Sequence, residues 1–250
     1  MKPKKKIVII GATSSIAEQC ARLWAKVEPS EIVLVGRNLD KVERVASDLK
    51  VRTPGTTITS IQVDFLDPNQ IQTLVDQVYR TGNVDIALIA HGSLPAQEAC
   101  QSDLNLCREA LNVNGISPVL FAETLAMHMQ KANSGTLAVI GSVAGDRGRK
   151  SNYVYGAAKG LVTRYVQGLQ HRLASTGVKV VLIKPGPTDT PMTAHLKQSG
   201  ASLAAVDRVA GEIVRGIENG RRVVYVPRIW SVIMMVIRHL PHFVFRRMDF

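Results

Sequence analysis

Short apolar runs alternate with longer amphipathic stretches along most of the chain. The first run, residues 7–10, is wholly apolar and β-branched, which is typical of a strand buried on both faces of a sheet. Small polar residues follow it, and residues 16–27 then have the periodicity of a helix. The pattern repeats and predicts strands at 7–10, 31–35, 58–63, 84–90, 136–140 and 178–183, and helices at 16–27, 39–50, 71–80, 104–131 and 155–174.

This alternation predicts an α/β fold. Apolar strands separated by helices form a parallel sheet covered on both faces, and right-handed crossovers make it a doubly wound, Rossmann-type sheet. No linker or low-complexity segment divides the chain. We therefore expect a single domain over residues 1–228, with residues 229–250 as an apolar and basic C-terminal tail of the same domain.

Sheets of this type bind ligands at the carboxyl ends of their strands, so the residues after each predicted strand are candidates. Residues 11–17 form a small-residue turn before a helix, where free backbone N–H groups can bind phosphates. An ordinary strand-to-helix turn is the alternative. Arg37 follows the second strand, where NAD-binding chains commonly carry an acidic residue. An arginine there suits a 2′-phosphate, which favours NADP(H) over NAD(H).

The later strand ends also carry small or polar residues. Asp64 could bind the adenine amine, and His91 could touch either the cofactor ribose or the substrate, or be a spectator. Ser142 follows the fifth strand, and residues 185–190 form a polar loop after the sixth. We expect these positions to meet around one ligand.

Tyr155 and Lys159 are a candidate proton-transfer pair. Their spacing places both side chains on one helix face, a turn apart. A cation beside a phenol stabilises the phenolate, so the tyrosine pKa is expected to fall from its ordinary value of about 10. The alternative is a tyrosine and a lysine on a solvated helix face.

The composition narrows the classes of partner. The 250 residues carry a formal net charge of +11, which can favour nucleic acid, anionic lipid or phosphorylated ligands. No nucleic-acid-binding signature accompanies the charge, so we expect no nucleic acid partner. The three cysteines form no C-x-x-C pattern, which argues against a disulfide framework and a thiolate metal site and favours a reducing cytoplasm. We expect no metal.

The two chain ends bear on localisation. Lysines that include Lys2 precede an apolar run of four residues, shorter than the roughly 7–15 of a secretory signal. The tail is nearly all apolar over residues 229–237 and then basic and aromatic through Phe250. It is too short to span a bilayer, but it could lie in a membrane interface, pack on the core or a partner subunit, or cover a lipid-linked substrate. We expect a cytoplasmic protein, with association with the inner membrane face left open.

The same residues resemble the classical short-chain dehydrogenase/reductase family across essentially the whole chain. The pair Tyr155-x-x-x-Lys159, Ser142 upstream and the loop beginning at Pro185 stand at the family's spacing. Asn114 matches the asparagine that completes the family's catalytic tetrad.

Two segments depart from the family pattern. The family's Thr-Gly-x-x-x-Gly-x-Gly turn here has Ile10 for the threonine and Ser15 and Ala17 for the later glycines. After the fourth strand the family has the motif Asn-Asn-Ala-Gly, whereas residues 89–92 of this chain are Ile-Ala-His-Gly. The small size of the turn residues is kept, so cofactor binding there remains the expectation.

The resemblance implies an NADPH-dependent carbonyl reductase. It implies that Tyr155 donates the proton, Lys159 lowers the tyrosine pKa and holds the ribose, Ser142 binds the carbonyl oxygen, and Asn114 holds a water. The implied catalytic residues are Asn114, Ser142, Tyr155 and Lys159. The implied cofactor-binding residues are Gly11, Thr13, Ser14, Ser15, Ile16, Arg37, Asp64, Phe65, Ala90, His91, Gly92, Tyr155, Lys159, Pro185, Gly186, Thr188 and Thr190. It also implies a homodimer or homotetramer.

A narrower resemblance covers residues 193–197, 234–241 and 245–247, which are similar to the reductase group of decaprenylphosphoryl-ribose 2-epimerisation. It implies a keto sugar on a polyprenyl phosphate, or another hydrophobic ketone, as substrate. Arg147, Arg149 and Lys150 could meet a substrate phosphate or form an exposed loop, and Tyr153 is expected in the pocket wall. The alternative function is a catalytically silent NADP-binding sensor or scaffold with a membrane-surface tail.

Overall fold

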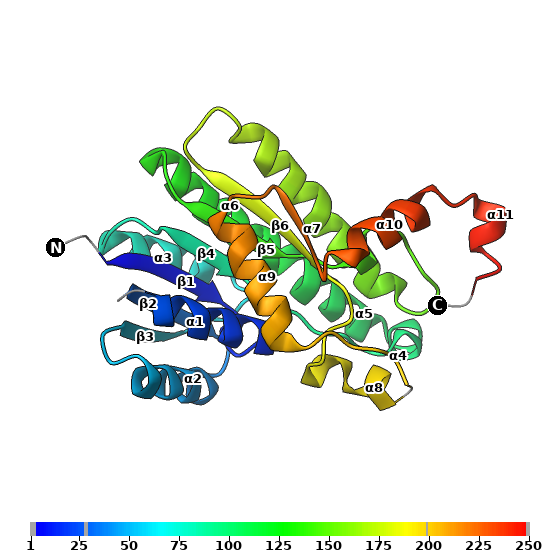
Figure 1. Cartoon of the computed structure of the whole chain (residues 1–250), viewed down its shortest axis with the longest axis horizontal. Coiled ribbons are helices and arrows are strands. Elements are labelled where there is room, and N and C mark those ends of the chain that lie inside the picture. The colour runs from blue at the N-terminus through cyan, green and yellow to red at the C-terminus, as the bar shows by residue number, and fades with distance from the viewer. Residues whose placement is uncertain (1–3, 28–29, 199, 249–250) are drawn as a thin grey trace.

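A seven-stranded parallel sheet runs through the protein (Figure 1). The computed structural model describes residues 4–27, 30–198 and 200–248, so Lys2 and Phe250 of the two terminal predictions lie outside the described residues. The strands are β1 (Lys5–Ile10), β2 (Ser30–Gly36), β3 (Thr57–Gln62), β4 (Ile86–Ile89), β5 (Thr136–Ile140), β6 (Lys179–Pro185) and β7 (Val223–Val226). Their order is β3-β2-β1-β4-β5-β6-β7, and every neighbouring pair is parallel. The predicted doubly wound α/β fold is confirmed, and its order reverses between β1 and β4.

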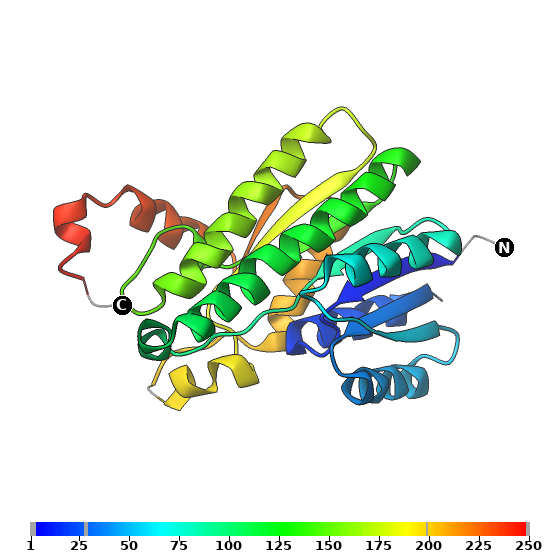
Figure 2. The same ribbon diagram turned by 180° about the vertical axis from the view of Figure 1, so that it is seen from behind.

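Helices cover both faces of the sheet (Figures 1 and 2). One face carries α1 (Ser15–Val27), α2 (Leu39–Arg52) and α9 (Val206–Glu218), and the other carries α3 (Pro68–Arg80), α6 (Ser117–Ala132) and α7 (Tyr153–Arg172). Successive residues of β1 enter different cores: Ile7 and Ile9 join the first, and Val8 and Ile10 the second. This explains why the strand is apolar at every position.

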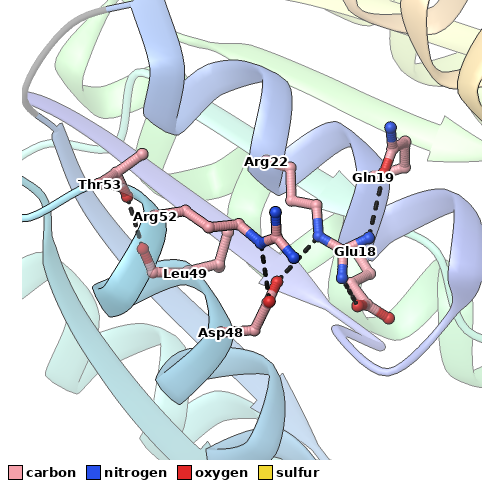
Figure 3. Close-up of polar contacts among 7 residues, drawn as sticks. All are labelled: Glu18, Gln19, Arg22, Asp48, Leu49, Arg52 and Thr53. Carbon is pink, nitrogen blue, oxygen red and sulfur yellow. Dashed lines mark hydrogen bonds and ion pairs between the residues drawn. The ribbon is translucent and has the colours of Figure 1, made fainter.

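Local interactions set the start of α2 and the packing of α1 against α2. Asn38 accepts a hydrogen bond from the Lys41 backbone N–H at 2.9 Å and so caps α2. Arg22 of α1 binds Asp48 of α2 at 2.9 Å, and Arg52 binds the same carboxylate at 2.7 Å (Figure 3). This network fixes α1 against α2, and with them the two loops that open those helices.

Two predictions of elements were incomplete. The predicted helix at 104–131 is divided into α5 (Leu104–Leu111), a π-helical turn (Asn112–Ile116) and α6, because the Ser117 N–H bonds the Asn112 carbonyl five residues back. The edge strand β7 and helix α9 were not predicted. The strand has only four residues and follows two arginines, so its apolar run is brief. The short helices α4 (Gln97–Ser102) and α8 (Ala194–Gln198) were also missed.

The C-terminal tail forms α10 (Ile229–His239) and α11 (His242–Phe245), which extend beyond one end of the body (Figures 1 and 2). At its start the Trp230 indole lies against Gly186, where an added Cβ would be 2.0 Å from the indole nitrogen. Farther along, Arg147 donates hydrogen bonds to the Ile237 and Leu240 carbonyls, the latter at 2.8 Å. The tail is therefore attached to the core at two points. Within the described ranges no helix is long and apolar enough to cross a bilayer.

Candidate active site

A cavity of about 620 Å³ opens at the carboxyl ends of the strands, within the size range of small-molecule sites. The loops after β1, β2, β4, β5 and β6 line it, together with the first turns of α7. Every predicted cofactor-binding residue except Asp64 is part of this lining. Asp64 is exposed instead, and its carboxylate accepts the Leu66 N–H at 2.9 Å.

The turn after β1 has the geometry of a phosphate cradle. Gly11 has φ of +83°, and a Cβ there would lie 2.6 Å from the His91 nitrogen, so only glycine fits. Helix α1 begins at Ser15, which places its free N–H groups at the cavity. Ala17, which replaces a family glycine, is fully buried in the core. Its methyl group therefore does not obstruct the turn.

Two positively charged side chains line the part of the cavity that follows β2. Arg37 and Lys41 both line the cavity, at the end of β2 and in the first turn of α2. Among the residues that the structure describes, no aspartate or glutamate lines the cavity. The chemistry of this corner suits an anionic group such as the 2′-phosphate of NADP.

Tyr155 and Lys159 face the cavity from the start of α7. Lys159 is 2% exposed, its Nζ donates to the Ile140 carbonyl at 3.1 Å, and Nζ lies 5.8 Å from the centre of the Tyr155 ring. The alternative of a solvated tyrosine–lysine pair is therefore wrong. Ser142, also buried, accepts the Ala144 N–H at 3.1 Å and hydrogen-bonds Tyr155.

The predicted fall in the Tyr155 pKa is not what the structure gives. Burial raises the pKa of Tyr155, and the hydrogen bond from Ser142 offsets only part of that rise. Burial also lowers the pKa of Lys159 to about 8, so the lysine charge is itself disfavoured. The spacing of Tyr155 and Lys159 could be read from the sequence, whereas the depth at which the pair is buried could not. Tyr155 is consequently held in its protonated form near neutral pH.

Asn114 lies behind the cavity, in the π-helical turn, and is fully buried. Its Oδ1 accepts the Ser93 N–H at 2.8 Å, and its Nδ2 donates to the Ala110 carbonyl at 2.9 Å. A Cβ on Gly92 would lie 2.8 Å from Asn114 Oδ1 and 3.7 Å from Lys159 Nζ. The glycine thus leaves space that both polar groups face.

His91 is part of the lining and is buried as a neutral imidazole. Its Nε2 is 2.8 Å from the Ser117 hydroxyl, and its ring centre is 4.5 Å from that of Phe65. Burial, with the nearby charges of Lys159 and Arg37, lowers its pKa to about 3. Among the described residues Nδ1 has no hydrogen-bond partner. This position favours ligand contact over a spectator role.

The loop after β6 is held by its own threonines. The Thr188 hydroxyl donates to the Gly186 carbonyl at 3.0 Å, and the Thr190 N–H donates to Thr193 Oγ1 at 3.2 Å. The Thr193 hydroxyl also donates to the Thr188 carbonyl. These bonds hold Thr188 and Thr190 at the cavity edge.

Sequence reasoning missed much of the rest of the wall. An apolar part is formed by Leu94, Val113, Val143, Met192 and Leu196. Asn152 is in the wall as well, whereas Tyr153, predicted there, is exposed and outside the lining. The only signal in the sequence was the helical spacing of Met192 and Leu196.

Comparisons with known proteins agree with this geometry. A family model described as short chain dehydrogenase matches residues 5–201. The chain is 32% identical to an uncharacterised oxidoreductase of Mycobacterium tuberculosis over 97% of this chain and 96% of that protein. It is 29% identical to an uncharacterised oxidoreductase of Streptomyces coelicolor, with 98% and 96% covered.

Solved structures share the fold at low sequence identity. A short-chain type dehydrogenase/reductase from Mycobacterium ulcerans has a TM-score of 0.80 at 20% identity, with 89% of this chain and 88% of that chain covered. ElxO with NADP bound has a TM-score of 0.79 at 20% identity, with 90% and 97% covered. Family model, relatives and fold converge, and the chain belongs to the short-chain dehydrogenase family as an NAD(P)-dependent oxidoreductase.

Proposed function

We propose that the chain is an NADPH-dependent carbonyl reductase in which Tyr155 is the proton donor. One observation carries the proposal: a single cavity is lined by the phosphate cradle, by Arg37, and by Ser142, Tyr155 and Lys159. These parts come from loops far apart in the sequence. Their meeting in one cavity supports a shared reaction.

Each catalytic side chain has a role that follows from its chemistry. NADPH, when bound, supplies a hydride to the carbonyl carbon. Tyr155, held protonated by burial, donates its proton to the carbonyl oxygen. The Ser142 hydroxyl donates a hydrogen bond to that oxygen and stabilises the charge that develops there. Lys159 holds the nicotinamide ribose, and Asn114 holds a water that links Lys159 to solvent.

The preference for NADP(H) is supported by charge. Arg37 and Lys41 line the cavity after β2 and could bind a 2′-phosphate, and among the described residues no carboxylate lines the cavity to bind ribose hydroxyls instead. ElxO, which shares the fold, was solved with NADP bound. Gly11 keeps the turn after β1 tight, because a side chain there would meet the His91 backbone.

The substrate in this proposal is a hydrophobic ketone, such as a keto sugar on a polyprenyl phosphate. The apolar part of the wall, which includes Val143, Met192 and Leu196, supports it. The exposed apolar residues Ile229 and Val232 on α10 support peripheral contact of this cytoplasmic enzyme with the inner membrane face. Equal recovery of full-length and Ile229-truncated protein with anionic vesicles would contradict that contact.

A homodimer or homotetramer is also part of the proposal. Leu111, Ile116 and Leu161 are exposed on or beside the neighbouring helices α5 and α7, and they could be covered by a second copy. Sedimentation velocity measures this directly, and a monomer at micromolar concentration would contradict it.

The reaction itself is tested by following NADPH absorbance with a panel of aliphatic, cyclic and sugar-derived ketones. We expect turnover with at least one apolar ketone and a slower rate with NADH. The proposal is wrong if the protein binds NADPH but oxidises it with none of them.

A further inference from the structure

One positively charged side chain in the cavity lining, that of Arg149, has no role in the proposed reaction. Its charged lining residues are Arg37, Lys41, Arg149 and Lys159, all cationic. The first two follow β2 at the adenosine corner, and Lys159 belongs to the catalytic group. Arg149 instead lies in the loop between β5 and α7, between Ser142 and Tyr155 in sequence. It lines the cavity from the same loop as Ser142, so we assign it to the substrate side of the cavity.

The guanidinium of Arg149 has no counterion in the described part of the chain. Among the described residues its Nε, which is buried, has no hydrogen-bond partner, and none of their carboxylates lines the cavity beside it. Burial lowers the pKa of Arg149, although an arginine still keeps its charge. A partly buried, unpaired charge is unfavourable unless a ligand compensates it.

Asn152 adds a second uncompensated group in the same wall. Its Oδ1 is buried and unpartnered among the described residues, and it makes no capping bond although it precedes the first turn of α7. The pocket wall thus offers a donor at Arg149 and an acceptor at Asn152. Buried polar atoms are rarely left in this state, and a bound ligand is one explanation.

The neighbouring basic residues are committed elsewhere. Arg147 donates to two carbonyls of the tail, and its guanidinium lies 3.8 Å from the centre of the Phe245 ring. Lys150 is exposed and outside the cavity lining. Of Arg147, Arg149 and Lys150, only Arg149 lines the cavity.

We propose that Arg149 binds an oxyanion, a carboxylate or a phosphate, that the substrate itself carries, and that Asn152 accepts a hydrogen bond from a hydroxyl beside it. The proposal rests on the reductase function above and specifies its substrate class: an anionic carbonyl compound with an apolar part. The planar guanidinium can bind either oxyanion through two hydrogen bonds. The apolar residues Val143, Met192 and Leu196 would meet the carbon skeleton.

Matched ketones test the charge requirement. Levulinate and its next two longer homologues are compared with their methyl esters, and dihydroxyacetone phosphate with dihydroxyacetone. We expect wild type to favour the charged member of at least one pair by about tenfold or more in kcat/KM. Preference for the keto acids identifies a carboxylate, and preference for the phosphate identifies a phosphate. The proposal is overturned if the charged member is not preferred in any of these comparisons, at any chain length.

Three variants assign the effect to Arg149. Arg149→Met should lose the preference, mainly through KM, and Arg149→Lys should restore part of it because a positive charge returns. Lys150→Met is the matched control, and it should keep the wild-type preference. An unchanged preference in Arg149→Met overturns the proposal.

A binding measurement separates this proposal from the proposed reaction. Calorimetric titration of the same keto acids and of dihydroxyacetone phosphate into NADP-saturated protein needs no turnover. Tighter binding to wild type than to Arg149→Met supports the oxyanion site even if no ketone is reduced. Equal binding to both proteins overturns it even if the reductase activity is found.

Discussion

Burial determines the protonation of the central residues. Tyr155, Lys159 and His91 all titrate in the direction that burial imposes, and neighbouring charges are secondary or absent among the causes. The cavity therefore holds a protonated phenol, a lysine with a weakened charge and a neutral imidazole near neutral pH. This combination suits proton donation to an oxygen better than storage of charge.

The lysine makes folding stability depend on pH. The pKa of Lys159 is about 8 in the folded protein and 10.5 ordinarily, so between these values the unfolded chain holds a proton that the folded chain does not. The free energy of unfolding should therefore rise with pH across this window. Urea unfolding should show that Lys159→Met lacks the rise and is more stable than wild type at neutral pH. Lys50→Met, at an exposed site, is the control, and parallel curves for Lys159→Met and wild type would refute this account.

Arg37 is expected to set the cofactor preference. Arg37→Asp should lower the NADPH-over-NADH ratio of kcat/KM by about tenfold to a hundredfold, because a charge-assisted hydrogen bond becomes a repulsion. Arg44→Asp makes the same charge change on α2 outside the cavity lining and should leave the ratio unaltered. A ratio that is the same in Arg37→Asp and Arg44→Asp would exclude the assignment.

The residues of the site were predictable where a strand end defines them. Gly11, Arg37 and Ser142 each follow an apolar strand, and parallel strands bring their carboxyl ends together. Asp64 satisfied the same rule, but its side chain turns to its own loop. Arg149 could be noticed only as one of several basic residues, since the sequence does not show which of them lacks a partner.

The elements around the site include a helical irregularity and two tail contacts that the periodicity of the sequence does not predict. The π-helical turn between α5 and α6 presents Asn114, and the apolar pattern continues through it, so the sequence predicts one helix. The tail is likewise tied to two active-site loops, at Gly186 through Trp230 and at Arg147 through the carbonyls that end α10. Neither connection has a local signal in the sequence.

The attachment of the tail depends on Arg147. Arg147→Gln removes the Nη1 group that donates to both carbonyls and the cation–π contact with Phe245, which together should cost about 1–3 kcal/mol of local stability. Limited proteolysis should cut α10 or α11 faster than in wild type. Lys131→Gln, which changes an exposed residue of α6, should be cut at the wild-type rate. Equal cleavage of all three proteins would show that the anchor is dispensable.

At the scale of the whole molecule, strand order creates the site, and a buried ion pair outside the cavity lining joins two of the elements around it. The order reverses between β1 and β4, which opens the crevice where the loops meet. Outside the cavity, Lys184 of β6 forms an ion pair with Asp146, which lies in the loop between β5 and α7. The Tyr225 hydroxyl of β7 donates a hydrogen bond to the same carboxylate at 2.8 Å. The periodicity of the sequence predicts the α/β architecture. It does not predict this ion pair, because Lys184 and Asp146 are far apart in the sequence and meet only in the folded chain.

Breaking that pair should lower global stability. Lys184→Met leaves the Asp146 carboxylate buried and unpaired, at a cost of about 3–5 kcal/mol in the free energy of unfolding. The double variant Lys184→Met with Asp146→Leu should recover most of the loss. Lys197→Met breaks an exposed pair with Asp189 and should cost only about 0–1 kcal/mol. Denaturant unfolding measures all three, and similar losses at both lysines would contradict the buried pairing.

The central claim is that Tyr155 gives the proton to the carbonyl oxygen, and the most direct test compares two tyrosines of α7. Tyr155→Phe removes a hydroxyl at the cavity, whereas Tyr153→Phe removes one from an exposed side chain outside it. With NADPH and a reducible ketone, Tyr155→Phe should lose about a hundredfold to ten-thousandfold in kcat while Tyr153→Phe keeps the wild-type rate. Full turnover by Tyr155→Phe would contradict the mechanism.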